Sequence, residues 1–107
     1  TKLIVVLGHT ACGAVKGACD DAKLGKLTRM LEKIKPAVNS VTLPEDISLR
    51  NSSNIDFVNN VAAKNVQLTI EKIIKDSTVL AEMQQSGEIN IVGGMYDIHS
   101  GAVTFYE

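Results

Sequence analysis

Residues 3–13 read Leu-Ile-Val-Val-Leu-Gly-His-Thr-Ala-Cys-Gly. The first five are apolar, three of these are β-branched, and a glycine closes the run. Such a pattern predicts a strand buried on both faces, as in parallel sheets that are covered by helices. Ligands of these sheets bind just beyond the carboxyl ends of the strands. The residues that follow this strand are therefore the first candidates for a functional site.

His9 and Cys12 come directly after the predicted strand. Imidazole nitrogen and thiolate sulfur are ligands that zinc favours, and a spacing of three residues lets one turn of chain aim both at one ion. Other interpretations remain open, because a cysteine can be a small core residue or a reactive thiol. Gly8 and Gly13 have the spacing of a phosphate-binding loop, but the Lys-Ser/Thr pair that should follow is missing.

Helical spacing of apolar residues, together with capping residues, predicts four helices after this turn. Pro36 predicts a kink or break in the second helix. Ser53 or Asn54 is expected to cap the third helix, and Ser77 the fourth. The four predicted helices cover residues 14–19, 24–39, 55–75 and 78–85.

Two further strands are predicted, over residues 89–92 and 102–106, and the Ser100-Gly101 turn indicates that the last strand is antiparallel. The predicted fold class is α/β: a parallel sheet core flanked by helices on both faces, with an antiparallel C-terminal edge strand. These two strands cannot fill both flanks of the buried strand at 3–7. We therefore interpret residues 1–107 as a single partial domain whose N-terminal half is absent.

The composition is that of one globular domain. The chain has 107 residues, 45% hydrophobic and 21% charged, with a net charge of −1. This charge, with only two Tyr and two Phe, predicts no nucleic-acid partner. No apolar run approaches the roughly 18–20 residues that span a bilayer, so no membrane partner is expected. Two cysteines seven residues apart fit a reducing compartment, and we predict a cytoplasmic location.

Two motifs far apart in the chain occur together. His-Thr-Ala-Cys-Gly-Ala at 9–14 follows the buried strand, and Ile-Val-Gly-Gly-Met-Tyr-Asp at 91–97 precedes Ser-Gly-Ala-Val at 100–103. A long helix with Asn-Val at 65–66 lies between them. In this combination the chain resembles, over nearly its whole length, the C-terminal half of the β-class carbonic anhydrases.

The resemblance implies a zinc-dependent carbonate dehydratase, which interconverts CO2 and bicarbonate on a zinc ion held by two cysteines and one histidine. It implies that His9 and Cys12 are two of the three zinc ligands and that Gly13 lies next to the substrate. The family's first motif, Cys-x-Asp-x-Arg, carries the other cysteine and does not occur in this sequence. Cys19 lacks the spacing and the arginine of that motif, so we expect the chain alone to have little or no activity.

The family also forms dimers and higher oligomers, which implies a homodimer or a larger homo-oligomer. The alternative to an incomplete enzyme is a non-catalytic folding or oligomerisation remnant without catalytic zinc, and a redox thiol protein is a third possibility. Outside the proposed site, Cys19 is expected to pack in the core. His99 is expected to be a solvated turn residue, and Asp97 is expected to organise that turn.

Overall fold

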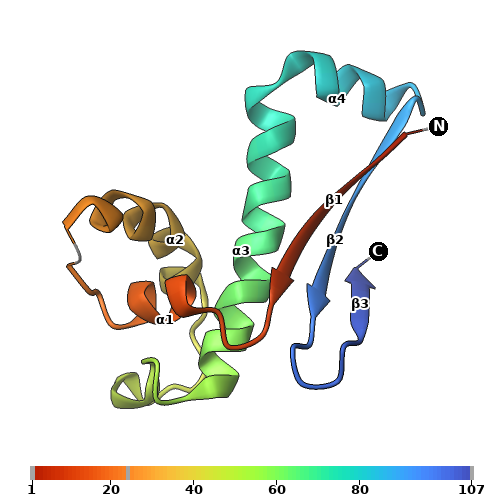
Figure 1. Ribbon diagram of the computed structural model, residues 1–107. Helices are drawn as coiled ribbons and strands as arrows, with labels where there is room; N and C mark the ends of the chain where they lie inside the picture. The colour runs from red at the N-terminus through yellow and green to blue at the C-terminus, as the bar shows by residue number, and fades with distance from the viewer. Residues whose placement is uncertain (1, 24, 107) are drawn as a thin grey trace.

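The strands form one three-stranded sheet in the order β1-β2-β3. The structure is a computed structural model that describes residues 2–23 and 25–106. Strand β1 (Lys2–His9) is parallel to β2 (Ile89–Tyr96), and β3 (Val103–Tyr106) is antiparallel to β2 (Figure 1). The predicted α/β class, with a parallel pair and an antiparallel C-terminal strand, is confirmed.

The four predicted helices are present, and Pro36 lies inside the second without ending it. Proline removes one helical hydrogen bond, here to the carbonyl of Glu32. Both residues are exposed, so water can solvate that carbonyl, while Leu31 and Ala37 hold the helix in the core. Of the two predicted effects of Pro36, the break is therefore wrong and the kink stays a prediction. The predicted start at Leu24 lies outside the described residues. The α-helices are α1 (Gly13–Cys19), α2 (Thr28–Ser40), α3 (Ile55–Asp76) and α4 (Thr78–Gln85), and the 3-10 turns are η1 (Gly25–Leu27) and η2 (Ile47–Leu49).

Side-chain caps define where α3 and α4 begin. The Asn54 side chain accepts a hydrogen bond from the Phe57 N–H at 3.3 Å, and the Ser77 hydroxyl accepts one from the Leu80 N–H at 3.3 Å. Each cap satisfies one of the N–H groups that the first turn of a helix leaves without a partner. The predicted cap at Ser77 is confirmed, and of the two candidates for α3 the structure selects Asn54.

Helix α3 is the centre of the core. It contacts both parallel strands and the helices α1, α2 and α4. Phe57, Val58 and Val61 on α3 are the largest fully buried side chains. Together with residues of α1 and α2 they form the main buried cluster, which comprises Val15, Cys19, Ala37, Phe57, Val58, Val61 and Ala62.

The sheet approaches α3 most closely at two glycines. A Cβ on Gly8 would lie 2.8 Å from the Met95 sulfur and 2.9 Å from a Val66 methyl group. A Cβ on Gly93 would lie 2.7 Å from the other Val66 methyl group. Since neither distance leaves room for a side chain, glycine is required at both positions for β1 and β2 to pack on the helix. Gly8 also immediately precedes His9, so this packing sets the position of the strand end.

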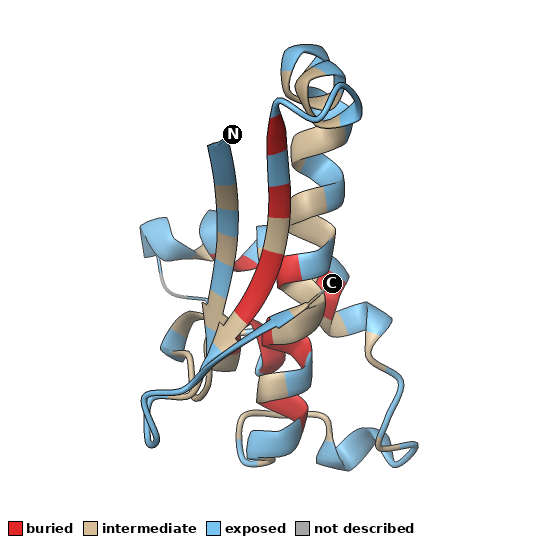
Figure 2. Ribbon diagram, turned by 90° about the vertical axis from the view of Figure 1, so that its right-hand side faces the viewer, coloured by how far each residue is buried: buried red, intermediate tan, exposed pale blue. Residues whose placement is uncertain are grey.

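The opposite face of the sheet is open. The helices of the described chain lie on the α3 side, and the strands stand in front of α3 in Figure 2. On the open face Leu3, Leu7 and Phe105 are 60%, 52% and 57% exposed. The prediction of a strand buried on both faces is therefore wrong for β1: Ile4, Val6 and Gly8 are half-buried on the α3 face, and the other face is exposed. Among the described residues β1 also has a neighbouring strand on one side only, which fits the predicted partial domain.

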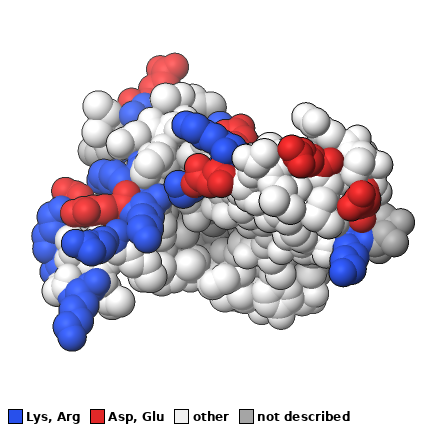
Figure 3. All heavy atoms as spheres, turned by 90° about the horizontal axis from the view of Figure 1, so that it is seen from above, with Lys and Arg blue, Asp and Glu red and all other residues white. Residues whose placement is uncertain are grey.

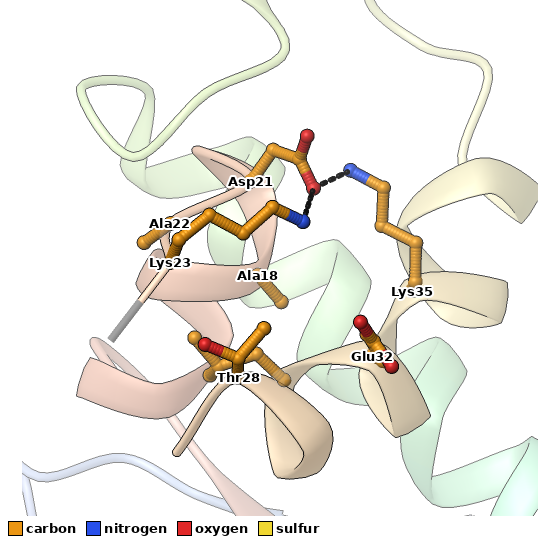
Figure 4. A pocket seen from close by; sticks show the side chains of 8 residues that line it. Ala18, Asp21, Ala22, Lys23, Thr28, Glu32 and Lys35 are labelled. Atoms are coloured by element: carbon orange, nitrogen blue, oxygen red, sulfur yellow. Dashed lines mark ion pairs between the residues drawn. The ribbon is translucent and has the colours of Figure 1, made fainter. Parts of the chain in front are cut away.

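Basic side chains gather at the end of the molecule that holds α2 (Figure 3). Asp21 lies among them and pairs with Lys23 at 3.6 Å and Lys35 at 3.4 Å, beside a small cavity of about 30 Å³ between α1 and α2 (Figure 4). Lys23, and to a smaller extent Lys35, hold the pKa of the Asp21 carboxyl below its ordinary value. The basic residues are thus partly neutralised by acidic ones. The small cavity between α1 and α2 is separate from the cavity at the carboxyl end of β1, because the two share no lining residue.

Asp20 ties the end of α1 to the loop before α3. The Ser52 hydroxyl and the Ser52 N–H both donate to its carboxylate, the latter at 2.8 Å, and these bonds hold the pKa of Asp20 below 3.8. A depressed carboxyl pKa stabilises the fold above about pH 4 and stops doing so as the pH falls through the folded-state value. We therefore expect Asp20→Asn to lower the melting temperature at pH 7 and to lower it less at pH 2. A difference that is equal at both pH values would contradict this assignment.

Candidate metal centre

His9 and Cys12 line one cavity at the carboxyl end of β1. His9 is the last residue of the strand, and Cys12 occupies the N-cap position of α1. The cavity measures about 290 Å³, and its walls come from β1, α1, α2 and α3. The other lining residues are Val6, Leu7, Gly8, Val15, Ile34, Ala62, Asn65, Val66 and Thr69. The structure therefore brings the two expected ligands to one mostly apolar hollow.

The ring of His9 is oriented by the backbone. Its Nδ1 lies 2.8 Å from the carbonyl oxygen of Thr10. A carbonyl oxygen only accepts hydrogen bonds, so the neutral ring carries its proton on Nδ1 and keeps a lone pair on Nε2. A hydrogen bond from the other ring nitrogen to a carbonyl oxygen is the usual way in which a metal-binding histidine is held. Nε2 is thus the atom of His9 that is available to a metal.

The turn between the two candidate ligands is held from both sides. The Thr10 N–H donates to the Tyr96 carbonyl at 3.0 Å, and the Thr10 hydroxyl accepts from the Ile98 N–H at 3.1 Å. On the other side the Ala11 N–H donates to the side-chain oxygen of Asn59 at 3.0 Å. Because the N–H groups of Thr10 and Ala11 are occupied, they are not free to cradle a phosphate. The interpretation of Gly8 to Gly13 as a phosphate loop loses its main support.

The side chains of His9 and Cys12 are of the kinds that bind zinc, but two are fewer than a zinc site needs. An imidazole and a thiol are suitable zinc ligands, whereas a zinc site needs at least three protein ligands. Within residues 2–23 and 25–106, no three His, Cys, Asp or Glu side chains are grouped to hold a metal ion. Cys19 belongs to the buried cluster, as predicted, and does not join the pair. Among the described residues, His9 and Cys12 are thus two candidate ligands where at least three are needed.

The two thiols should differ sharply in reactivity. Burial, with a smaller contribution from Asp20, raises the pKa of Cys19 to about 11. Cys19 is then almost entirely protonated at pH 7.5, and only the thiolate is a nucleophile. We expect iodoacetamide to label Cys12 in the native chain and to label Cys19 only after urea is added. Peptide mass spectrometry reads both sites, and equal labelling in the native chain would show that Cys19 is not buried.

Gly13, Asp97 and His99 are the other residues to which the sequence assigned a place. Gly13 is the first residue of α1 and is exposed, with open space where a side chain would be. Its place beside a substrate stays a prediction. Asp97 accepts hydrogen bonds from the N–H groups of His99 at 2.8 Å and Ser100 at 3.3 Å, which lower its carboxyl pKa. Asp97 thus organises the β2–β3 turn and His99 is an exposed turn residue, as expected.

Sequence reasoning did not find the roles of Asn59 and Thr10. Both hold the turn that joins the candidate ligands, and Asn59 does so from 48 positions away in the chain. The only local signal at Asn59 is an asparagine within a predicted helix that has a broad apolar stripe, and this signal does not name a partner.

The fold and the site define a class of protein. It is an α/β protein in which a parallel strand ends in a histidine that shares one cavity with a cysteine of the following turn. The sequence model of the family described as carbonic anhydrase matches residues 1–103. The chain belongs to the carbonic anhydrase family, and its structural neighbours place it in the β class.

Individual relatives agree with this assignment. The chain is 31% identical over 106 residues to a carbonic anhydrase of Mycolicibacterium smegmatis, covering 94% of this chain and 47% of that protein. It is 29% identical to carbonic anhydrase 2 of Mycobacterium tuberculosis, covering 92% of this chain and 46% of that protein. The chain therefore spans about half the length of the curated relatives that it matches.

Solved structures show the same relation. The crystal structure of a β-carbonic anhydrase of Aspergillus fumigatus superposes with a TM-score of 0.81 at 31% identity, covering all of this chain and 49% of that one. A tetrameric β-carbonic anhydrase of Sordaria macrospora has a TM-score of 0.75 at 22% identity, covering 98% of this chain and 52% of that one, and supports the fold alone. Among the described residues, no helix has the length and apolar character needed to cross a membrane.

Proposed function

We propose that this chain supplies two zinc ligands, His9 and Cys12, to a zinc-dependent carbonate dehydratase that interconverts CO2 and bicarbonate. The observation that carries the proposal is that both side chains line one cavity at the carboxyl end of β1, in a chain that belongs to the carbonic anhydrase family. A zinc ion with an open position would supply a bound water that is acidic enough to serve as a nucleophile at neutral pH.

The residues around the pair fit this role. Nε2 of His9 is free to bind a metal because Nδ1 is engaged by the Thr10 carbonyl. Val6, Val15 and Val66 line the cavity and offer an apolar surface to an uncharged substrate such as CO2.

The chain alone is proposed to be inactive. It has two ligands where three are needed, and its open sheet face exposes Leu3, Leu7 and Phe105. A polypeptide with the family's Cys-x-Asp-x-Arg motif would have to provide the third ligand. The free edge of β1 and the open face are the surfaces that remain for it to pack against.

Zinc content and activity measured together test the proposal. We would purify the chain alone and mixed with an N-terminal half from the Mycolicibacterium smegmatis relative, then measure zinc by elemental analysis and CO2 hydration by stopped flow. We expect background hydration for the chain alone, and zinc with measurable hydration for the mixture. In mixtures made with His9→Ala or Cys12→Ser, the zinc content and the hydration rate should both fall to the values measured for the separate halves. Full activity of the chain alone would contradict the proposal.

A second candidate is a non-catalytic folding or oligomerisation module, and the open apolar face is the observation that favours it. In this case the chain would bind no zinc with or without the added half. A homodimer or larger homo-oligomer remains a proposal in both cases, supported by the exposed apolar side chains of β1 and β3. Sedimentation velocity of wild type and of a Leu3→Lys variant tests it, because a charge on the open face should disperse an oligomer that uses that face.

A cytoplasmic location also remains a proposal. Both cysteines are free thiols in the structure, which fits the reducing compartment that the sequence indicates. Localisation of the tagged chain in cell fractions would test it.

A further inference from the structure

Ala11 adopts an unusual backbone conformation between the two candidate ligands. Its φ is +53°, in the left-handed region that residues other than glycine disfavour. This conformation persists only if the surroundings hold it. A relaxed backbone at Ala11 would swing Cys12 relative to His9, since only the turn connects them.

One side chain provides the contact from α3 that holds this residue. The Ala11 N–H donates to Oδ1 of Asn59 at 3.0 Å. Asn59 is half-buried in the second turn of α3, where its neighbours Phe57, Val58 and Val61 are fully buried, so the helix cannot easily shift. The acceptor therefore comes from the most deeply buried part of α3 and reaches the turn across 48 positions of sequence.

We propose that Asn59 is a positioning residue that sets the geometry of the His9–Cys12 pair by accepting the Ala11 N–H bond. Asn59 itself binds no metal in this role. It acts on the backbone between the ligands, as partners beyond the metal ligands do in other metal sites. The effect of Asn59 on metal binding rests on the proposed function. Its effect on the turn rests only on the observed hydrogen bond and backbone conformation of Ala11.

Three variants separate positioning from folding. Asn59→Ala removes the acceptor, Asn59→Asp keeps an oxygen in the same place, and Asn60→Ala changes the exposed neighbour on the same helix turn as a matched control. Thermal unfolding of each metal-free variant shows whether it folds. A site-positioning role predicts that Asn59→Ala remains folded.

Cobalt(II) is the probe for the site, because its absorption spectrum reports thiolate coordination. We expect wild type, Asn59→Asp and Asn60→Ala, each mixed with the N-terminal half of the Mycolicibacterium smegmatis relative, to bind Co(II) with a thiolate-to-cobalt band. Asn59→Ala should bind it about 10–100-fold more weakly and with an altered spectrum. Equal affinity and an unchanged spectrum for Asn59→Ala would overturn the proposal.

Hydrogen exchange of the Ala11 amide tests the turn without metal. The amide should be protected in wild type and Asn59→Asp and should exchange faster in Asn59→Ala, while other amides remain unchanged. If the wild-type mixture bound no cobalt, the proposed metal function would fail, and the Ala11 amide would still decide whether Asn59 holds the turn. An Ala11 amide that exchanges equally in all variants would overturn the positioning role.

Discussion

Phe57→Ala is expected to remove most of the free energy of unfolding at 25 °C. Phe57 is 1% exposed and sits where α3 meets α1 and α2. Truncating such a side chain costs about 3–5 kcal/mol, because the apolar contacts are lost and a cavity is left. Small domains have only about 5–15 kcal/mol in total, and a chain with an open sheet face belongs at the low end. Urea unfolding followed by circular dichroism measures the loss.

The same substitution on the open face is the matched control. Phe105 is 57% exposed, so Phe105→Ala should change the free energy of unfolding by no more than about 0.5 kcal/mol. The pair of variants also tests the arrangement of the sheet. If Phe105→Ala cost as much as Phe57→Ala, another surface would cover the open face in solution.

Gly8→Ala is expected to cost about 1–3 kcal/mol, the usual range for an overfilled core. The new methyl group would lie 2.8 Å from the Met95 sulfur and 2.9 Å from a Val66 methyl group. Met95 can move, but Val66 is buried on the rigid helix α3, so β1 must shift. Since His9 follows Gly8, zinc binding should weaken together with stability. Urea unfolding and zinc titration in the complemented mixture measure the two effects.

Two comparisons make this prediction specific. Gly13→Ala places the same methyl group in open space and should leave stability nearly unchanged. Gly8→Ala would bring a new methyl group against the side chain of Val66, and Val66→Ala removes the atoms that it would contact. The loss in free energy of unfolding in the double variant should therefore be smaller than the sum of the losses in the two single variants. Strict additivity would mean that the clash between β1 and α3 is not the cause.

The ends of β2 and α2 show why sequence patterns were insufficient at some positions. Gly93-Gly94 looked like the end of a strand at residue 92, because glycine is unfavourable within strands. The structure continues β2 to Tyr96, because residues 93–96 pair with β1 on one side and β3 on the other. Glycine is needed at 93 because α3 approaches so closely that a Cβ there would lie 2.7 Å from Val66. Pro36 similarly looked like a helix break, but tertiary burial of Leu31 and Ala37 outweighs the lost hydrogen bond.

Local patterns were sufficient for much of this protein. The apolar run at 3–7 defined β1, helical spacing and caps defined the helices, and the residues after the strand defined His9 and Cys12 as the candidate pair. Each of these depends on neighbours within a few positions, which the order of residues contains directly. The anchoring of Ala11 by Asn59 and the open face of the sheet depend instead on contacts between distant segments. Such contacts exist only when α3 has packed against the sheet, because packing, and not spacing along the chain, determines which groups meet.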